Sequence, residues 1–461
     1  MYDLEFYERA AKSWPSFCRY RPLAVVAEDA KILMNFLDAA IIVKKENRII
    51  LKISQSQRSN MHNIIIVITM IIITSMLSSC GQQSNVSNQN KKTNHESDIT
   101  VVEAGGYHSV ALKKDGTVWS WGRNNVGQLG DGLSIDRFEP SKINGLENII
   151  ALSGKVDHTL AVTKEGQVWA WGYNPDGRID GRDEVHPTPV LIQGLDDIVS
   201  VSAGGSFSLA LDKHGTVWSW GSNLYGQLGN GNGNGNGEDN PLPRKIISIH
   251  DIVQIEAGGD FALALSKDGT VWAWGRNSFN QLGNGSDKDE TKPIKVPNLK
   301  VIKVSAGDNH SIALAKDGLV WSWGYNSNGQ IGDGTANVYA EDGSLQSNHN
   351  KGKPIKIKGL KDIQAVEGGF NHSIALAKDG GVWTWGWNEY GQLGNGTNKD
   401  QLTPVKLNGI SDIHILNTGY YHTIALGSNA LAYSWGDNTY GQVGTSAIDR
   451  MIIADPINIK F

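Results

Sequence analysis

From residue 98 to the C-terminus, apolar and polar positions alternate in short period-two runs separated by glycine-rich turns. The clearest run is an aromatic residue, a small residue, Trp and Gly, and it returns about every fifty residues. Its seven copies end at Gly122, Gly172, Gly221, Gly275, Gly324, Gly386 and Gly436. In an extended strand, period two places both aromatic side chains on one face and the small residue on the other. Copies at this regular spacing indicate a repeat architecture rather than a set of independent domains.

Each unit contains the signals of four strands. An apolar strand ends near Ala-Gly, a second strand follows, and a Lys-Asp-Gly turn leads into the aromatic strand. An Asn-x-x-Gly-Gln-Leu-Gly loop then precedes a short strand that follows Pro. In second strands such as His372–Leu376, large and small side chains also take opposite faces. Because such sheets can nest on copies of themselves around an axis, the pattern predicts an all-β, seven-bladed propeller of four-stranded antiparallel blades.

The two ends of the repeat region suggest how the ring closes. The first unit starts at Asp98 without the Pro-led strand that precedes the other units, and the chain ends in Asp455–Phe461, which resembles that strand. We therefore expect the C-terminal strand to join blade one and close the ring, because such a closure removes an exposed sheet edge.

The recurring phrases are Ala-Gly-x-x-His-Ser, Asp-Gly-x-Val-Trp-x-Trp-Gly and Asn-x-x-Gly-Gln-Leu-Gly. They resemble the repeats of the regulator-of-chromosome-condensation family, and the resemblance covers residues 98–461. It implies a seven-bladed propeller. It implies little about function, because one scaffold of this kind serves many tasks.

The residues before the repeats have a different character. Ile64–Leu77 is an apolar run that is shorter than a membrane span and close in length to a signal-peptide core. Leu77–Gly81 reads Leu-Ser-Ser-Cys-Gly and resembles the lipobox of bacterial lipoproteins, which implies cleavage before Cys80 and acylation of its thiol. We therefore predict a signal peptide with a lipobox over 61–80 and a flexible polar tether over 81–97. The alternative is a short uncleaved anchor followed by an ordinary cysteine.

Residues 1–60 fit neither the signal nor the repeats, although Leu23–Val43 could form a helix. A misassigned start or a fused fragment would explain them, and we leave them unassigned. The chain has a net charge of −5, and the part after residue 60 is more acidic still, which disfavours a surface for nucleic acid. Cys18 and Cys80 are the only cysteines, so the sequence excludes a disulfide scaffold and a multi-cysteine zinc site.

The sequence lacks the motifs of common catalytic sites: it contains no Gly-x-Ser-x-Gly, no Gly-x-x-x-x-Gly-Lys and no His-Glu-x-x-His. Five units begin their second strand with His, whereas Phe takes this place in the other two. These residues are His108, His158, Phe207, Phe261, His310, His372 and His422. Equivalent positions on neighbouring blades lie too far apart to share a metal ion, so we expect structural hydrogen bonds from the histidines. We predict no enzymatic activity, no cofactor and no metal.

Aromatic residues in the loops, unlike those in the strands, have no fixed partner in the repeat. The loop between strands one and two and the loop between strands three and four emerge on the same side of an antiparallel blade. Their candidate partner-binding residues are Tyr107, Tyr173, Tyr225, Phe279, Tyr325, Phe370, Trp387, Tyr390, Tyr420, Tyr421 and Tyr440. Tyr and Trp are enriched at binding hot spots, which favours a docking face over ordinary packing between loops. Two lengthened loops, 230–237 and 339–351, are expected to be flexible insertions.

These observations predict a non-catalytic, lipid-anchored protein of the bacterial cell envelope that faces outside the cytoplasm. We expect a monomer that binds an unidentified protein through its aromatic loops, contacts the membrane through its lipid only and binds no nucleic acid. A secreted enzyme inhibitor of the same family grips its target with this kind of face, so the resemblance implies a mode of contact. The alternative is binding of a cell-wall or extracellular glycan by the same face. A distant alternative, implied by the family alone, is guanine-nucleotide exchange on a small GTPase.

Overall fold

The computed structural model describes residues 40–45, 48–53, 99–175, 177–179, 185–232, 240–428, 431–446 and 452–461. The chain divides into two units, Met1–Lys92 and Thr93–Phe461. The predicted signal peptide, Cys80 and the tether lie outside the described residues. Within those residues, no helix has the length and apolarity that a membrane crossing requires.

In the first unit, β1 (Ala40–Lys45) and β2 (Arg48–Ile53) pair as an antiparallel hairpin. The expected helix over Leu23–Val43 is therefore wrong for its last four residues. Three consecutive β-branched residues, Ile41–Val43, explain the difference because they favour an extended backbone.

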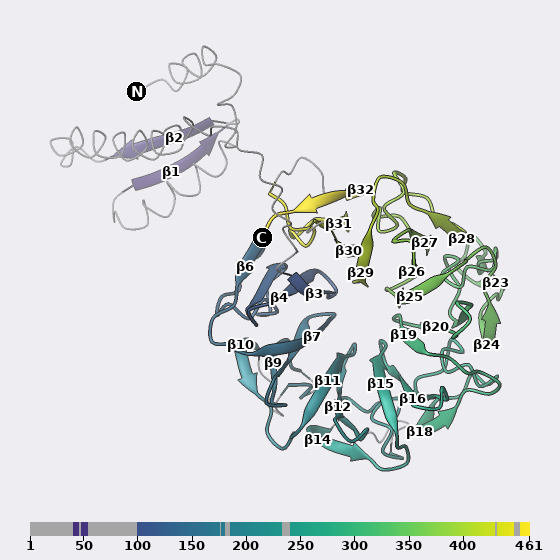
Figure 1. The fold of residues 1–461 in the computed structure, drawn as a ribbon. Helices are drawn as coiled ribbons and strands as arrows, with labels where there is room; N and C mark the ends of the chain where they lie inside the picture. The colour runs from purple at the N-terminus through teal and green to yellow at the C-terminus, as the bar shows by residue number, and fades with distance from the viewer. Residues whose placement is uncertain are drawn as a thin grey trace, which may run out of the picture. The chain divides into compact units, whose positions relative to one another are not determined.

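Seven four-stranded antiparallel sheets form the second unit, and Figure 1 shows them as blades around a central axis. This confirms the predicted all-β, seven-bladed propeller. Blades one to three comprise β3 (Ile99–Ala104), β4 (His108–Lys113), β5 (Val118–Gly122) and β6 (Arg137–Lys142); β7 (Ile149–Lys155), β8 (His158–Thr163), β9 (Val168–Gly172) and β10 (His186–Leu191); and β11 (Ile198–Ala203), β12 (Phe207–Asp212), β13 (Val217–Gly221) and β14 (Asn240–Ile246).

The remaining four blades repeat this order, with an extra hairpin inserted in blade five. They comprise β15 (Ile252–Ala257), β16 (Phe261–Ser266), β17 (Val271–Gly275) and β18 (Glu290–Lys295); β19 (Lys303–Ala306), β20 (His310–Leu314), β21 (Val320–Gly324) and β24 (Lys351–Lys356); β25 (Ile363–Gly368), β26 (His372–Ala377), β27 (Val382–Gly386) and β28 (Gln401–Lys406); and β29 (Ile413–Thr418), β30 (His422–Gly427), β31 (Ala432–Asp437) and β32 (Ile452–Ile459).

The second tryptophan of each aromatic strand forms the contact between blades. Trp274 of blade four is fully buried and packs with Phe207, Leu209 and other residues of blade three. Its indole N–H donates to the carbonyl oxygen of Gln227, which lies in the loop of that same neighbouring blade (2.9 Å). The repeated Gln of the loop motif therefore has a structural role: its backbone accepts from the next blade's indole. Truncation of such a tryptophan to Ala would remove about 3–5 kcal/mol of stability.

The glycine after this tryptophan is required by the backbone. Gly386 has a φ of 99°, and a Cβ at this position would lie 2.6 Å from the carbonyl oxygen of Asn371. A residue with a side chain would be both strained and obstructed there. The aromatic strand can therefore turn directly into the following loop only with Gly at its end.

The ring closes differently from our expectation. The C-terminal strand β32 pairs with β31 in blade seven, and blade one is complete with β3–β6. Side-chain packing joins the two blades, because Ile424 and Leu426 of blade seven share a buried cluster with Trp121 of blade one. The prediction that the C-terminal strand joins blade one is therefore wrong. The Pro-containing strand belongs to the aromatic strand before it, since short loops connect strands that pair.

A candidate interaction surface on the loop rim

One face of the propeller carries both sets of aromatic loops, and we call it the loop rim. In each blade the start of the second strand pairs with the end of the third, as in His108 with Gly122. The residues just beyond this pair are neighbours, and the backbone N–H of Arg123 donates to the carbonyl oxygen of Tyr107 (2.9 Å). The antiparallel register thus brings the two loops of a blade together, as the sequence predicts.

Seven of the eleven predicted residues meet in one group on this rim, which we call the aromatic cluster. Its members come from blades one, six and seven: Tyr107, Phe370, Trp387, Tyr390, Tyr420, Tyr421 and Tyr440. Tyr421 lies at the centre, with ring centroids 4.9 Å from Tyr107, 5.1 Å from Tyr390 and 5.5 Å from Trp387. Each ring is half-buried, so the cluster is packed together but still accessible.

The other four predicted residues lie apart from this cluster. Phe279 and Tyr325 are 4.5 Å apart, and the Arg276 guanidinium lies 4.9 Å from the ring of Tyr225 and 5.2 Å from that of Phe279. Tyr173 is the most exposed of the eleven, at 38%, and its ring faces the guanidinium of Arg178. For these residues the alternative of packing between neighbouring loops describes the geometry well.

The arginines of the loop rim were not among the predicted residues. Arg123 lies 5.5 Å from the Tyr107 ring and 5.2 Å from the Tyr440 ring, as Arg276 lies over Tyr225 and Phe279. Both arginines directly follow the Trp-Gly of their aromatic strand, and each stacks on a loop aromatic of the preceding blade. The repeated Trp-Gly-Arg-Asn sequence was a signal for this cation–π contact.

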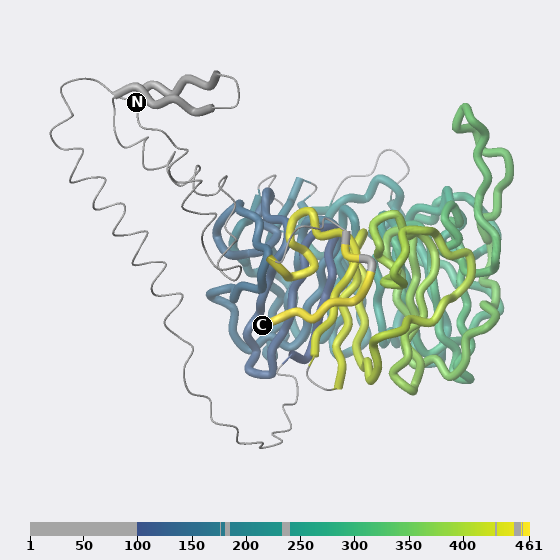
Figure 2. Tube along the Cα trace, turned by 90° about the horizontal axis from the view of Figure 1, so that it is seen from above, coloured from purple at the N-terminus to yellow at the C-terminus, as the bar shows by residue number. Residues whose placement is uncertain are grey.

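An inserted hairpin extends the loop rim in blade five. It consists of β22 (Val338–Tyr339) and β23 (Leu345–Ser347), and we call it the finger. Figure 2 shows the finger, in green, standing out from the edge of the ring. Val338, Tyr339 and Leu345 are each almost half exposed, and the Tyr339 hydroxyl lies 3.1 Å from that of Tyr325.

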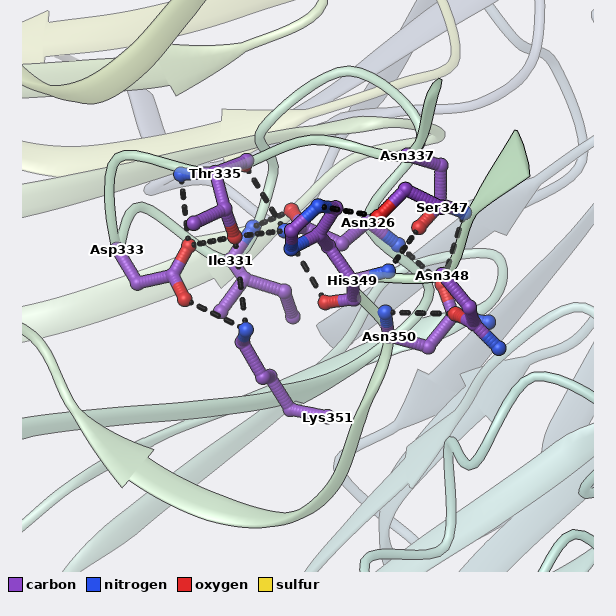
Figure 3. A network of polar contacts seen from close by, with 10 residues as sticks. All are labelled: Asn326, Ile331, Asp333, Thr335, Asn337, Ser347, Asn348, His349, Asn350 and Lys351. Carbon is purple, nitrogen blue, oxygen red and sulfur yellow. Dashed lines mark hydrogen bonds and ion pairs between the residues drawn. The ribbon is translucent and has the colours of Figure 1, made fainter. Parts of the chain in front are cut away.

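A polar network anchors the base of the finger (Figure 3). The Asn337 side chain accepts from the His349 backbone N–H (2.6 Å) and donates to the Asn350 side-chain oxygen (3.0 Å). Lys351 and Asp333 form an ion pair at 2.8 Å beside it. The insertion at 339–351, expected to be flexible, is thus a hairpin with a hydrogen-bonded base, whereas most of 230–237 lies outside the described residues.

Side chains from several blades also meet around the central axis. Lys155 of blade two donates to the carbonyl oxygens of Ala257 in blade four (3.2 Å) and Ala306 in blade five (2.9 Å). Near it are Glu103, Glu256 and Glu367 from blades one, four and six. Burial, together with the charge of Glu367, raises the pKa of Glu256 to about 8. The repeat contained a signal for part of this group, because the three glutamates occupy the same position near the end of the first strand of their units, whereas Lys155 is the last residue of that strand in blade two.

A hydrogen bond crosses the mouth of this axis on the loop rim. The Tyr420 hydroxyl of blade seven donates to Asp308 of blade five at 3.0 Å. Burial, reinforced by the nearby Asp308 carboxylate, raises the pKa of Tyr420 well above its usual value. This phenol therefore stays neutral at physiological pH and holds one edge of the aromatic cluster in place.

The five histidines make structural hydrogen bonds of the expected kind, each to a hydroxyl of the next blade. His310 Nε2 lies 2.8 Å from Ser373 Oγ, and His422 Nε2 lies 2.8 Å from Ser109 Oγ across the seam between blades seven and one. Burial lowers the pKa of His310 to about 3. Among the described residues, no three His, Cys, Asp or Glu side chains are grouped so that they could hold a metal ion.

Comparison with known proteins places the chain in a family. The sequence profile of the RCC1-like domain matches residues 181–460, and profiles of the regulator of chromosome condensation (RCC1) repeat match 99–128, 149–178 and 115–162. The chain belongs to the RCC1-like family. This propeller is 33% identical over 321 residues to the ultraviolet-B receptor UVR8 of Arabidopsis thaliana, covering 66% of this chain and 69% of the receptor.

Other relatives and solved structures share the fold at greater distance. The propeller is 32% identical over 308 residues to the human E3 ubiquitin-protein ligase HERC2, which covers 64% of this chain but only 5% of the ligase. Human WBSCR16 superposes with a TM-score of 0.65 at 22% identity, covering 75% of this chain and 94% of WBSCR16. Prp20p of Saccharomyces cerevisiae, described with its binding to Gsp1p and histones, superposes with a TM-score of 0.63 at 25% identity, covering 82% and 91%.

Proposed function

We propose that this RCC1-like propeller is a non-catalytic protein that docks a protein partner on its aromatic cluster. The observation that carries the proposal is the convergence of seven half-buried aromatic side chains from blades one, six and seven on one rim. Large aromatic rings that are held by one another lose little conformational entropy when a partner covers them. Such pre-organised Tyr and Trp side chains are typical of binding hot spots.

The surroundings of the cluster support contact with a protein surface of mixed polarity. Arg123 lies along one side against Tyr107 and Tyr440, and Glu389 is exposed beside Tyr390. Hot spots commonly combine aromatic rings with a charged rim that excludes water from the centre. The finger would contact the edge of a partner that extends over blade five.

The proposed location is the cell envelope, with the protein held by a lipid on Cys80. The support is the apolar run Ile64–Leu77 followed directly by Leu-Ser-Ser-Cys-Gly. Metabolic labelling with a fatty acid should mark the wild-type protein and not Cys80→Ala. Equal labelling of both would remove the anchor from the proposal.

A capture experiment tests the docking surface. Unlipidated Cys80→Ser protein would be used as bait in envelope extracts, and partners retained by wild type would be compared with those retained by Trp387→Ala/Tyr421→Ala. Tyr173→Ala is the matched control, because Tyr173 is an exposed rim aromatic outside the cluster. We expect a partner that is lost only with the double variant. Equal recovery with all three baits would refute the surface.

Glycan binding by the same cluster is the second candidate, because sugar rings also stack on Trp and Tyr. Binding of labelled cell-wall glycans that is lost in Trp387→Ala or Tyr390→Ala, without capture of any protein, would favour it over a protein partner. Nucleotide exchange on a small GTPase has no supporting observation beyond the family itself.

A further inference from the structure

In several blades, other residues of the chain cover the ring of the first tryptophan of the aromatic strand and accept its indole N–H. This tryptophan lies near the face opposite the loop rim, which we call the turn rim. In blades one, three and four a lysine Nζ lies over its ring: Lys113 over Trp119 at 4.1 Å, Lys245 over Trp218 at 4.8 Å and Lys295 over Trp272 at 5.1 Å. In the same blades its indole N–H donates to Thr117, Asp212 and Ser266, respectively. Both the face and the N–H of these indoles are thus occupied.

Blade six lacks the lysine cover. Lys406 stands opposite Trp383 in the strand register, as Lys295 stands opposite Trp272. However, the Lys406 ammonium lies 3.4 Å from Asp379, and no lysine of the described chain lies over the Trp383 ring. Trp383 is packed in part against the core between blades five and six, and the rest of its side chain has no lysine of the described residues over it.

Blade six also lacks the acceptor for the indole N–H. The positions that supply Ser266 and Thr117 in other blades are Ala377 and Gly381 here, and neither has a polar side chain. Within the described part of the chain, no atom accepts a hydrogen bond from the Trp383 indole. Blade five also lacks a polar residue at these positions, but it has the Leu319 side chain where blade six has Gly381.

The missing side chains leave a hollow of about 520 Å³ on the turn rim of blade six. Trp383 and Ala377 line it, together with Lys361, Lys378, Lys406, Asp362 and Asp379. Three lysines and two aspartates thus line the hollow. Asp379 is engaged by Lys406 and by the Gly381 N–H, whereas Lys361 and Lys378 form no ion pair among the described residues. Within the part of the chain that the structure describes, the hollow therefore offers the indole of Trp383 without a lysine over it, an indole donor and two lysines outside any ion pair, with one net positive charge after Asp362 is counted.

We propose that this hollow binds an acidic sugar, with the pyranose ring on Trp383 and its carboxylate between Lys361 and Lys378. The ring face of an indole is electron-rich and attracts the weakly positive C–H groups of a sugar. The carboxylate forms charge-assisted hydrogen bonds with the ammonium groups, and the indole N–H donates to a ring or hydroxyl oxygen. A volume of this order suits one or two sugar rings. The site is separate from the aromatic cluster and does not depend on the proposed protein partner.

The test is a titration of the Cys80→Ser chain, labelled at its indole nitrogens, with trigalacturonate as the probe. The Trp383 resonance would be assigned by its loss in Trp383→Phe. We expect that one resonance to move on titration, and the neutral methyl ester of the probe to bind at least about threefold more weakly, as loss of exposed ion pairs implies. AMP serves as a second anionic probe with a planar ring.

Two variants and one control test which residues of the hollow are needed for binding. Lys361→Gln/Lys378→Gln should weaken binding about threefold to tenfold. Gly381→Thr should abolish it, because a Cβ there would lie 2.8 Å from Cε of Lys406 and 2.9 Å from Oδ1 of Asp379, and the threonine hydroxyl would be placed to accept the indole N–H as Thr117 does in blade one. Lys316→Gln, at the equivalent turn of blade five, should bind as wild type does. The proposal is overturned if the Trp383 resonance does not move at about 10 mM trigalacturonate, if Gly381→Thr binds normally, or if AMP binds and the uronate does not.

Discussion

Single side chains explain how neighbouring blades adhere. The Ser373 hydroxyl donates to the carbonyl oxygen of Gln330, so its oxygen is left to accept from His310 Nε2–H. This arrangement selects the neutral histidine with its proton on Nε2. The seam between blades three and four replaces such a pair by Phe207 and Ala262, which shows that an apolar pair also fits. The seams between blades therefore accept other residue pairs at this position besides His with a hydroxyl.

Replacement of the polar His310–Ser373 pair by an apolar pair gives a first prediction. Ser373→Ala alone leaves a buried His310 N–H without an acceptor and should cost about 1–3 kcal/mol of unfolding free energy. His310→Phe/Ser373→Ala recreates the Phe207–Ala262 pair and should recover part of that loss. Urea denaturation at pH 7.5 measures both. A double variant that is less stable than Ser373→Ala alone would contradict this account of the seam.

The same histidine predicts a pH dependence. Its pKa is about 3 in the fold, below the ordinary value of 6.5, so only the unfolded chain takes up a proton between these values. The contribution of His310 to stability is therefore complete above pH 6.5 and is lost as the pH falls toward about 3. His310→Phe/Ser373→Ala should reduce the slope of stability against pH near pH 5 by at most about 1.4 kcal/mol per pH unit. An unchanged slope in urea titrations would show that folding does not lower the pKa of His310.

The carboxylates of the axis predict the opposite sign. The pKa of Glu256 is raised from 4.5 to about 8, so the folded protein holds a proton that the unfolded chain releases. Its contribution to stability is present below pH 4.5 and is lost as the pH rises to about 8. Glu256→Gln should gain stability relative to wild type over that range, by at most about 1.4 kcal/mol per pH unit, and Glu139→Gln on the exposed β6 should not. Thermal melts at pH 5 and pH 8.5 measure the gain in stability. A gain that is the same at both pH values would contradict the raised pKa of Glu256.

Whole strands were predictable because each blade repeats the same side-chain alternation. Val382–Gly386 alternates bulky and small residues, and the structure assigns a strand with those bounds. The finger was not predictable in this way, because its strands contain only five residues in total and have no counterpart in the other units. Its shape depends on Asn337 and Asn350, whose hydrogen bonds join positions 13 residues apart. The sequence predicted that the loop aromatics share one side of the propeller. It did not predict that seven of them gather in blades one, six and seven, because that depends on which neighbouring loops each carry a large ring.

The anchored base of the finger gives a prediction about local stability. Asn337→Ala removes the acceptor of the His349 N–H and the donor to Asn350, at a cost of about 1–3 kcal/mol if the amides stay buried. We expect faster hydrogen exchange confined to residues 338–350, with the exchange of β21 and β24 unchanged. Asn348→Ala is the control, since its side chain caps only an exposed turn. Loss of protection throughout blade five would mean that the finger and the blade unfold together.

The ring as a whole closes by packing, and the sequence could not reveal this. A four-strand repeat that is read one strand out of phase yields the same list of strands, so the terminal Pro-containing strand was assigned to the wrong blade. Side-chain contacts decide the matter: Ser109 of blade one binds His422 of blade seven, and Ile459 of β32 packs against the Trp121 cluster. The seam between the first and last blades is therefore built like the other seams, only without a covalent link.

This equivalence predicts that the ring can be opened elsewhere. In a circular permutant of residues 93–461, a flexible linker would join Phe461 to Thr93, and new ends would lie between Ile247 and Ser248. Ile247 is 93% exposed and connects blades three and four, so the cut leaves every four-stranded sheet intact. We expect a single cooperative unfolding transition close to that of the unpermuted unit. A permutant cut in the loop between β13 and β14 should unfold earlier, because β14 must then pair without its connection to β13. Equal stability of the two permutants, or loss of cooperativity on cutting between blades, would show that the seams are not interchangeable and that the chain ends hold the ring by some other contact.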